Sequence, residues 1–195
     1  MKKIIIAGIA LTLLGLACGE EDLTDPTPVN TPAVVLKNVE LSFNERNITY
    51  LKESLSDDFV FYFDPDDVGQ NPPVGHYIIP ESWSYAEFTG AVTNLYRKAY
   101  SVSLTIPTAS VGEPDPNATT YKAENINIKL LVMVDEINGF IADAGYCNFA
   151  FERYDGKEGE KLWRLTKWWD NTAASYDANP ALEPASLGRV LALYR

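Results

Sequence analysis

Histidine and cysteine are almost absent from this sequence, which has one histidine and two cysteines among its 195 residues. Two cysteines, Cys18 and Cys147, are too few for a fold built on disulfides, and together with His76 they cannot form a cysteine–histidine zinc site. We therefore expect no metal site and no cofactor. His76 is the one histidine base available to acid–base chemistry.

Basic residues are also few, since 16 Lys and Arg stand against 27 Asp and Glu and the formal net charge is −11. Binding to nucleic acid depends on Lys and Arg side chains that replace the counterions of the phosphates. No cluster of such residues occurs here, so the composition excludes nucleic acid as a partner. A chain of 195 residues, 46% hydrophobic, is the size of one folded domain.

The longest uncharged run is too short to cross a bilayer. Residues 4–17 follow the basic start Met1-Lys2-Lys3 and carry no charge, but a membrane helix needs about 20 apolar residues. The pattern is typical of a signal peptide over residues 1–17. Its end, Leu16-Ala17-Cys18-Gly19, resembles a bacterial lipobox. The resemblance implies cleavage before Cys18 and a lipid on the Cys18 sulfur.

The next segment, residues 18–32, is rich in proline, threonine and acidic residues. This composition is typical of an extended, solvated tether. Gly19 after the cysteine resembles lipoproteins sent to the outer membrane, and Glu20-Glu21-Asp22 would suit export to the surface. We therefore expect a protein of the bacterial cell envelope, held by lipid on Cys18 at the outer membrane, on its periplasmic face or its outer surface.

The folded domain is predicted over residues 33–172, and helices come first. Thr31-Pro32 supplies a helix cap and a first-turn proline before an apolar stripe, which predicts a helix over 33–54, broken near Asn47. Residues 59–63 are bulky and apolar on both faces, as expected for a short covered strand. After a proline-rich loop, Ser84-Tyr85-Ala86-Glu87 has the spacing of a capping box and predicts a helix over 84–99.

From residue 100 onward the apolar residues recur at every second position, which predicts strands. Alternating runs cover 102–106, 126–134, 140–154 and 162–170, and Asn138-Gly139 predicts a hairpin between the second run and the third. The last three runs predict a three-stranded meander. Helices followed by strands indicate an α+β fold with helices on one face of a curved antiparallel sheet. Residues 173–195 are predicted to form a C-terminal tail.

This order of elements resembles the nuclear-transport-factor-2-like (NTF2-like) superfamily, whose cone-shaped fold is shared by ketosteroid isomerases and SnoaL-like polyketide cyclases. The strand 59–63 and the pattern Trp163-x-Leu165-x-x-Trp168-x-Asp170 carry the resemblance. The chain is also similar to bacterial lipoproteins that have a proline-rich tether before such a domain. The resemblance implies a pocket between the helices and the concave sheet, but no particular reaction, because one fold hosts many functions.

Five residues are the candidates for the lining of such a pocket. Tyr50, Tyr62, Trp83 and Trp168 lie near the ends of predicted elements, where a polar tip can face a cavity. Asp143 lies among small residues in a predicted strand and is expected to be the innermost acid of a cavity between the helix 84–99 and the meander. Burial would raise its pKa. The alternative is an outward-facing strand residue.

Three classes of function remain open. The protein is a binding module for a small apolar or aromatic ligand, an assembly part that forms a homodimer or holds an envelope protein, or an enzyme similar to SnoaL and ketosteroid isomerase. An enzyme would draw its acid and base from Asp143, Asp64, His76 and Tyr62. Asp64-x-Asp66 starts like a calcium loop but lacks its bidentate acid. We favour binding or assembly over catalysis because no charged cluster has a recognisable spacing.

Overall fold

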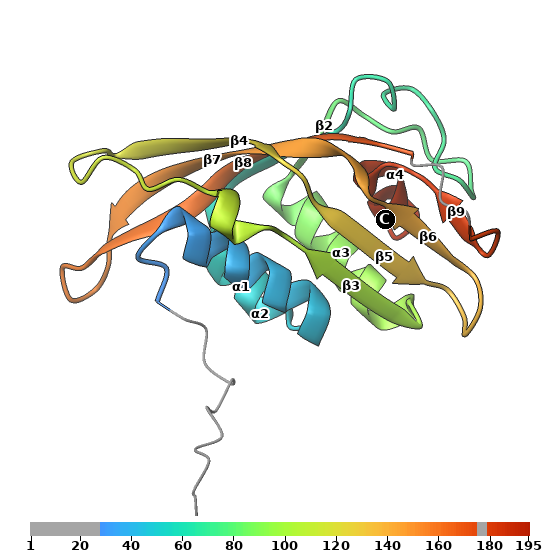
Figure 1. The fold of residues 1–195 in the computed structure, drawn as a ribbon, viewed down its shortest axis with the longest axis horizontal. Helices are drawn as coiled ribbons and strands as arrows, with labels where there is room; N and C mark the ends of the chain where they lie inside the picture. Colours follow the sequence, from blue (N-terminus) through green and yellow to red (C-terminus); the bar gives the residue numbers. More distant parts are fainter. Residues whose placement is uncertain (1–27, 175–178) are drawn as a thin grey trace, which may run out of the picture.

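Helices cover one side of strongly curved sheets in this protein (Figure 1). The structure is a computed structural model and describes residues 28–174 and 179–195. The predicted signal peptide, the lipobox at Cys18 and most of the tether lie outside the described residues. Within the described residues, no helix has both the length and the apolar character needed to span a membrane.

Two consecutive helices, α1 (Pro32–Glu45) and α2 (Ile48–Ser54), open the domain. The side chain of Thr31 caps α1 by accepting a hydrogen bond from a backbone N–H of its first turn. Arg46 has a left-handed backbone (φ 55°) that ends α1, and Asn47 caps α2 in the same way as Thr31 caps α1. The predicted helix over 33–54 with a break near Asn47 is confirmed.

The third helix, α3 (Tyr85–Lys98), begins at the predicted capping box. One carboxylate oxygen of Glu87, Oε2, accepts hydrogen bonds from the backbone N–H of Ser84 at 3.0 Å and from its hydroxyl at 2.9 Å. The prediction of a helix over 84–99 is therefore confirmed. The loop between residues 63 and 81, also predicted, contains no helix or strand.

The larger sheet has five strands in the order β2-β1-β8-β7-β4. Their bounds are Ser82–Ser84 (β2), Leu55–Tyr62 (β1), Lys161–Ala173 (β8), Ala144–Asp155 (β7) and Thr120–Ile126 (β4). The antiparallel β7–β8 hairpin was predicted as part of the meander. The third strand of the meander was wrong, because β7 pairs with β4, whereas most of the run 126–134 forms β5 of the other sheet. The strand β1 pairs with β8 in parallel, which the sequence pattern did not indicate.

The smaller sheet has four strands in the order β3-β5-β6-β9. Their bounds are Ser101–Thr105 (β3), Lys129–Met133 (β5), Gly139–Ala142 (β6) and Leu182–Pro184 (β9), and a short 3₁₀ turn, η1, covers Thr108–Ser110. The hairpin predicted at Asn138-Gly139 joins β5 to β6. The predicted runs 126–134 and 140–154 are each broken in two, at residues 127–128 and at Asp143, where the chain passes from one sheet to the other.

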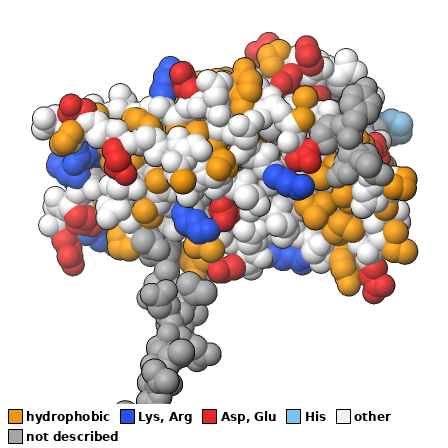
Figure 2. Space-filling model, viewed as in Figure 1, with side chains coloured by type: hydrophobic (Ala, Val, Ile, Leu, Met, Phe, Trp, Pro, Cys, Tyr) orange, Lys and Arg blue, Asp and Glu red, His pale blue; other side chains and the backbone are white. Residues whose placement is uncertain are grey.

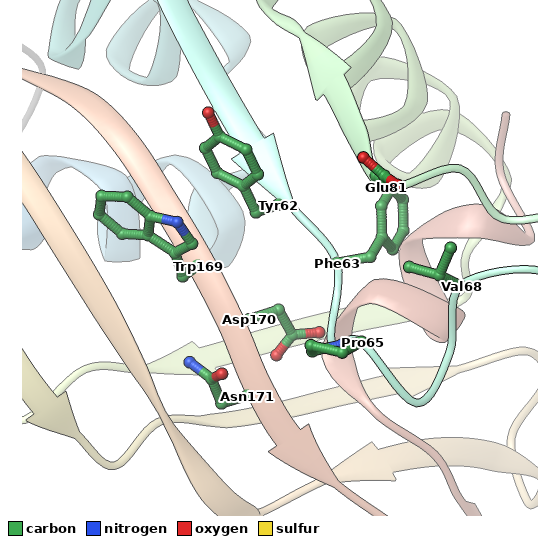
Figure 3. Close-up of a pocket in the computed structure, with 8 residues that line it drawn as sticks. All are labelled: Tyr62, Phe63, Pro65, Val68, Glu81, Trp169, Asp170 and Asn171. Atoms are coloured by element: carbon green, nitrogen blue, oxygen red, sulfur yellow. The ribbon is translucent and has the colours of Figure 1, made fainter.

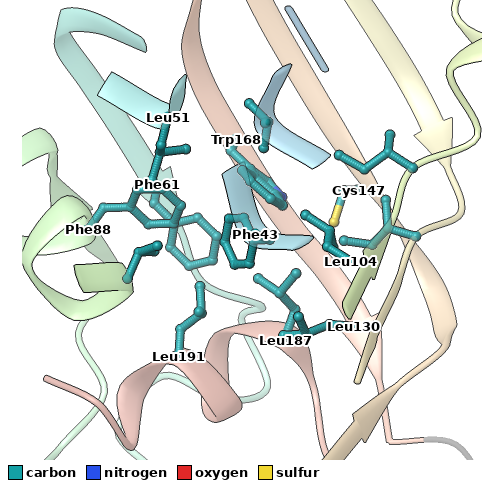
Figure 4. Close-up of a cluster of buried hydrophobic side chains, with 14 of the residues drawn as sticks. Phe43, Leu51, Phe61, Phe88, Leu104, Leu130, Cys147, Trp168, Leu187 and Leu191 are labelled. Atoms are coloured by element: carbon teal, nitrogen blue, oxygen red, sulfur yellow. The ribbon is translucent and has the colours of Figure 1, made fainter. Parts of the chain in front are cut away.

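The concave side of the sheets is filled by one aromatic and aliphatic core (Figure 4). Trp168 lies at its centre, with its ring centroid 5.8 Å from those of Phe61 and Phe88 and 5.1 Å from that of Phe149. All four side chains are at most 1% exposed. The space between α3 and the sheet, where the sequence analysis placed a cavity, is therefore packed with side chains.

The C-terminal segment is part of this core rather than a tail. The helix α4 (Leu187–Ala192) packs against α3, β6 and β8. Its residues Leu187, Val190 and Leu191 are fully buried, and Figure 4 shows Leu187 and Leu191 pointing into the core. The predicted boundary at 173 therefore differs from the structure, in which β9 and α4 complete the domain.

The domain also begins earlier than the predicted residue 33. Val29 is 8% exposed, and its carbonyl accepts a hydrogen bond from the Trp163 N–H at 2.7 Å. Residues 28–32, assigned to the tether from composition, thus include a segment fixed to the start of β8.

The surface seen in Figure 2 mixes charges of both signs and shows no gathering of Lys and Arg. Hydrophobic side chains collect at the end of the molecule where the β5–β6 hairpin lies. Val134 and Ile137 in this hairpin are 51% and 70% exposed. The tip of the β5–β6 hairpin is therefore the part of this face with the most exposed apolar side chains.

Candidate functional site

Two aromatic rings lie together on the outer face of the larger sheet, the face away from the helices. Tyr62, the last residue of β1, is paired with Trp169 of β8, and their ring centroids are 5.5 Å apart with an angle of 9° between the planes. Figure 3 shows the two rings side by side over the strands, with the helices behind the sheet. Strand alternation explains the placement, because Phe61 and Trp168 turn inward and their neighbours turn outward. We call Tyr62 and Trp169 the aromatic platform.

A cleft of about 390 Å³ opens beside the platform. It forms because β1 leaves the sheet after Tyr62 while its partner β8 continues to Ala173. Its lining is mainly apolar and consists of Tyr62, Phe63, Pro65, Val68, Glu81, Trp169, Asp170 and Asn171 (Figure 3). This volume lies within the range of about 300–1,000 Å³ that is usual for small-molecule sites. We call it the platform cleft.

Polar groups surround the platform on its other side. The ammonium groups of Lys122 and Lys167 each lie 6.0 Å from the ring centroid of Trp169, a distance at which a cation is attracted to an aromatic face. A smaller hollow of about 190 Å³ adjoins the ring there, lined by Lys122, Glu124, Asn148, Phe149, Trp169 and Asn171. The indole of Trp169 therefore separates two hollows.

Asp170 is the buried acid of this region, at 1% exposure. Its carboxylate accepts hydrogen bonds from the backbone N–H of Thr172 at 3.0 Å, the Thr172 hydroxyl at 2.6 Å and the backbone N–H of Gly188 at 2.6 Å. Burial raises the pKa of Asp170 to about 7, although these hydrogen bonds oppose the rise. Asp170 thus binds the first turn of α4.

Asp67, in the loop after β1, is a second anchor for α4. Its carboxylate accepts a hydrogen bond from the hydroxyl of Ser186, the cap of α4, and lies 3.8 Å from the guanidinium Nε of Arg189. Burial is the largest influence on Asp67 and raises its pKa above the usual range. Two buried carboxylates therefore fix the start of the C-terminal helix.

Replacing Gly188 by alanine is expected to lower the free energy of unfolding by about 1–3 kcal/mol. A Cβ atom there would lie 2.7 Å from Cδ1 of Phe63 and 2.9 Å from Oδ2 of Asp170. Gly90→Ala is the matched control, because this glycine of α3 has nothing within 4 Å of the added Cβ, and it is expected to raise stability by up to about 1 kcal/mol. Urea denaturation measures both changes. Equal effects of the two substitutions would contradict the close packing of α4 against Phe63 and Asp170 at Gly188.

Of the four aromatic candidates from the sequence, Tyr62 lines the platform cleft. Trp83 and Trp168 are fully buried and Tyr50 is 4% exposed, and none of these three is among the residues that line it. The indole N–H of Trp83 donates to the hydroxyl of Tyr77 at 3.0 Å. These three aromatic residues therefore serve the core.

Asp143 is not the innermost acid of a cavity. It lies at the bend between β6 and β7, where it is exposed, and its Oδ2 is 3.6 Å from the Nζ of Lys129. The small residues beside it serve the bend instead of lining a void. Gly145 has φ +81°, and a Cβ there would lie 2.3 Å from the carbonyl oxygen of Asn171 in β8. The alternative of an outward-facing residue describes Asp143.

The four acid–base candidates do not come together. Asp64 accepts a hydrogen bond from the Asp66 N–H at 2.8 Å within its own loop, and His76 is exposed in the same loop. Neither residue lines the platform cleft with Tyr62, and Asp143 does not do so either. Over residues 28–174 and 179–195, no three His, Cys, Asp or Glu side chains are grouped as a metal ion would require.

The sequence analysis missed Trp169 and Asn171, the two outward residues of β8 that line both hollows. A signal for them was present, because strict alternation along Trp168-Trp169-Asp170-Asn171 puts the second and fourth residues on one face. Once Trp168 is assigned to the core, Trp169 must face outward.

Known proteins resemble this chain in fold rather than in sequence. The sequence matches no family model and no curated protein. Among solved structures, LinA matches with a TM-score of 0.50 and 13% identity over 71% of this chain and 80% of LinA. Hexachlorocyclohexane dehydrochlorinase LinA-type3 from Novosphingobium barchaimii matches with a TM-score of 0.46 and 14% identity over 71% of this chain and 81% of the other.

An NTF2-like superfamily protein from Salmonella enterica matches with a TM-score of 0.43 and 12% identity, over 75% of this chain and 91% of the other. With the observed order of helices and curved strands, the likeness to LinA shows the predicted α+β fold, in which helices pack on one side of a curved sheet. At such low identity the likeness concerns the fold alone.

Proposed function

We propose that this chain is a lipid-anchored, non-catalytic binding module of the bacterial cell envelope, which holds a small molecule with an apolar face in the platform cleft. One observation carries the proposal: the concave interior is filled by the core and α4, whereas an apolar cleft walled by Tyr62 and Trp169 opens on the outer face. A cavity with aromatic walls and a few polar groups is the usual form of a small-molecule site.

The surroundings of Asp170 support binding over catalysis. Acid–base catalysis needs an acid and a base that both reach the substrate. The carboxylate of Asp170 instead accepts hydrogen bonds from Thr172 and from the N–H of Gly188, so its oxygens serve to hold α4. LinA-type3 is named as a dehydrochlorinase, but a shared fold does not carry a reaction to this chain.

The position of Val29 supports an anchored module with an accessible cleft. The chain enters the domain at Val29, whose carbonyl accepts the N–H of Trp163 near the start of β8. Trp169 lies six residues further along this strand, roughly 20 Å away at about 3.3 Å per residue. An anchor at Cys18 would therefore attach near one end of β8 and leave the platform cleft toward the other. The outer membrane, indicated by Gly19, is the membrane we propose.

The binding proposal predicts that a probe with an apolar face shifts the signal of Trp169 alone. The chain has four tryptophans, so labelling with 5-fluorotryptophan gives four resonances, and Trp169→Phe assigns the one of interest. Titration with 1-anilinonaphthalene-8-sulfonate is expected to shift this resonance saturably. Tyr62→Ala is expected to weaken the binding about tenfold or more, because it removes one ring of the platform.

Tyr146→Ala is the matched control, since Tyr146 is 39% exposed on β7 and does not line the platform cleft. It is expected to leave binding of the probe unchanged. A saturable shift at Trp168 that Tyr62→Ala does not affect would place the ligand in the core and contradict the proposal.

The lipid anchor is tested separately. Cys18→Ser is expected to move the protein from the membrane fraction to the soluble fraction, and retention in the membrane would contradict a lipid at Cys18.

A further inference from the structure

We infer that the ligand of the outer face is a saccharide, whose ring packs on Tyr62 and Trp169 and whose chain continues across β8 toward β7 and β4. This inference rests on the proposed function and names its ligand class. It uses three observations on the described residues: the flatness of the platform, the hydrogen-bonding groups around it, and the hollows that continue on both sides of Trp169.

The platform has the geometry that stacking of a sugar requires. The planes of Tyr62 and Trp169 differ by 9°, and in Figure 3 both rings lie beside each other with their faces turned to the viewer on the side away from the helices. A pyranose ring has a face of C–H bonds with partial positive charge, which is attracted to the negative face of an aromatic ring. Two nearly parallel rings on one strand pair offer such a surface.

The groups around Trp169 match a ligand that carries hydroxyl groups. Asn148 and Asn171 supply amides, which both donate and accept hydrogen bonds, and Lys122 and Glu124 add a donor and an acceptor. The Oδ1 of Asn148 already accepts the N–H of Asn125 at 2.8 Å, which leaves its NH₂ group to donate. A purely apolar ligand would remove these groups from water without replacing their hydrogen bonds, which is costly.

The local charge also favours a neutral ligand. Lys122 and Lys167 flank the indole, and the carboxylates of Asp58, Glu124 and Glu152 lie in the adjoining hollows, so both signs are present around the platform. The chain as a whole is far more acidic, at −11. A strongly anionic or cationic ligand would meet charges of its own sign, whereas hydroxyl groups pair with either.

A second copy of the chain fits this face less well. The centres of stable protein interfaces are depleted in Lys and Glu and enriched in apolar residues. Here two ammonium groups lie 6.0 Å from the central indole. We therefore treat self-association as an outcome of the test.

The extent of the hollows indicates more than one sugar unit. The cleft of about 390 Å³ lies on one side of Trp169, and the hollow of about 190 Å³ lies on the other. A third hollow of about 420 Å³ continues along β8 past Lys167, over the small outward residue Ala150. All three include Trp169 in their lining, so a chain that stacks on this ring extends into neighbouring space.

The test is titration of the fluorotryptophan-labelled protein with cello-, malto-, xylo-, manno- and chito-oligosaccharides of one to six units. At least one series is expected to shift the Trp169 resonance saturably, with the six-unit chain binding about tenfold or more tighter than the single sugar. Trp169→Ala, followed by calorimetry, is expected to weaken binding of that chain at least about tenfold. Tyr100→Ala is expected to leave it unchanged, because Tyr100 is 58% exposed just before β3 of the smaller sheet.

The remaining outcomes separate this inference from the proposed function. If the anilinonaphthalene probe shifts Trp169 and no oligosaccharide does, the saccharide inference is overturned and the binding module stands. If neither kind of probe acts at Trp169, both proposals fail. If light scattering shows a dimer that Trp169→Ala converts to a monomer, the platform is an interface between copies and the saccharide inference is overturned.

Discussion

Trp168→Ala is expected to lower the free energy of unfolding by about 3–5 kcal/mol. The indole of Trp168 is fully buried at the centre of the core, in ring contact with Phe61, Phe88 and Phe149. Truncation removes this apolar surface and leaves a cavity between α3 and β8 that rigid neighbours cannot fill. Urea denaturation followed by circular dichroism measures the change.

The adjacent residue supplies the matched control. Trp169→Ala removes the same side chain from the opposite face of β8, where it is partly exposed and its ring centroid lies 5.5 Å from that of Tyr62. The substitution is expected to lower the free energy of unfolding by less than about 1.5 kcal/mol, which is the upper end of the contribution of one aromatic pair. Losses of equal size for the two tryptophans would show that both indoles belong to the core, and the aromatic platform would then not exist.

Stability is expected to fall as the pH rises from about 4 to about 7, by on the order of 4 kcal/mol. The pKa of Asp170 is raised by burial from 3.8 to about 7, so within this window the folded protein keeps a proton that the unfolded chain has released. Below the window both states hold the proton, and above it both have lost it. The pKa of Asp67, also raised by burial, acts in the same direction.

Urea denaturation at several pH values between 4 and 8 tests this dependence, with two variants. Asp170→Asn cannot ionise, so it is expected to remove most of the dependence of the unfolding free energy on pH. Near pH 4 it is expected to lower this free energy by about 1–3 kcal/mol, because one hydrogen-bond acceptor for α4 is lost. Asp143→Asn alters an exposed acid and is expected to keep the slope. A slope of the same size in Asp170→Asn and the unaltered protein would contradict the assignment.

The helices were predictable because their signals are local. Thr31 and Pro32 begin α1, Asn47 separates α1 from α2, and the Ser84 and Glu87 pair begins α3, each through contacts within a few residues. The α+β fold class followed from the order of such elements. The β5–β6 hairpin likewise depends on a local turn, so its place was visible in the sequence.

The inward and outward faces of β8 were harder to predict because the strand contains an irregularity. Trp163 and Leu165 point inward, and strict alternation would then put Trp169 inward as well. The register between β7 and β8 shifts between Ala150 and Phe151, and after it Trp168 and Asp170 take the inward face. A bulge changes the face of every later residue, so the alternation in the first half of β8 cannot be extended to its second half.

The role of α4 was hidden for another reason, since its contacts join residues far apart in the chain. The hydroxyl of Ser186 reaches Asp67 across 119 residues of sequence, and the N–H of Gly188 reaches Asp170. Periodicity describes which face of an element is apolar but does not identify its partner. The small residues around Asp143 misled the prediction similarly, because a sheet bend and a cavity both call for small side chains.

The burial of Leu187, Val190 and Leu191 also sets the order in which the protein matures. A ribosome releases these residues after all the strands of the larger sheet, so the growing chain carries an uncovered apolar surface until α4 arrives. Contacts across such long sequence separations slow folding, because the loops that they close are long. The incomplete chain therefore stays open to chaperones, and the core is covered only when residues 186–194 dock.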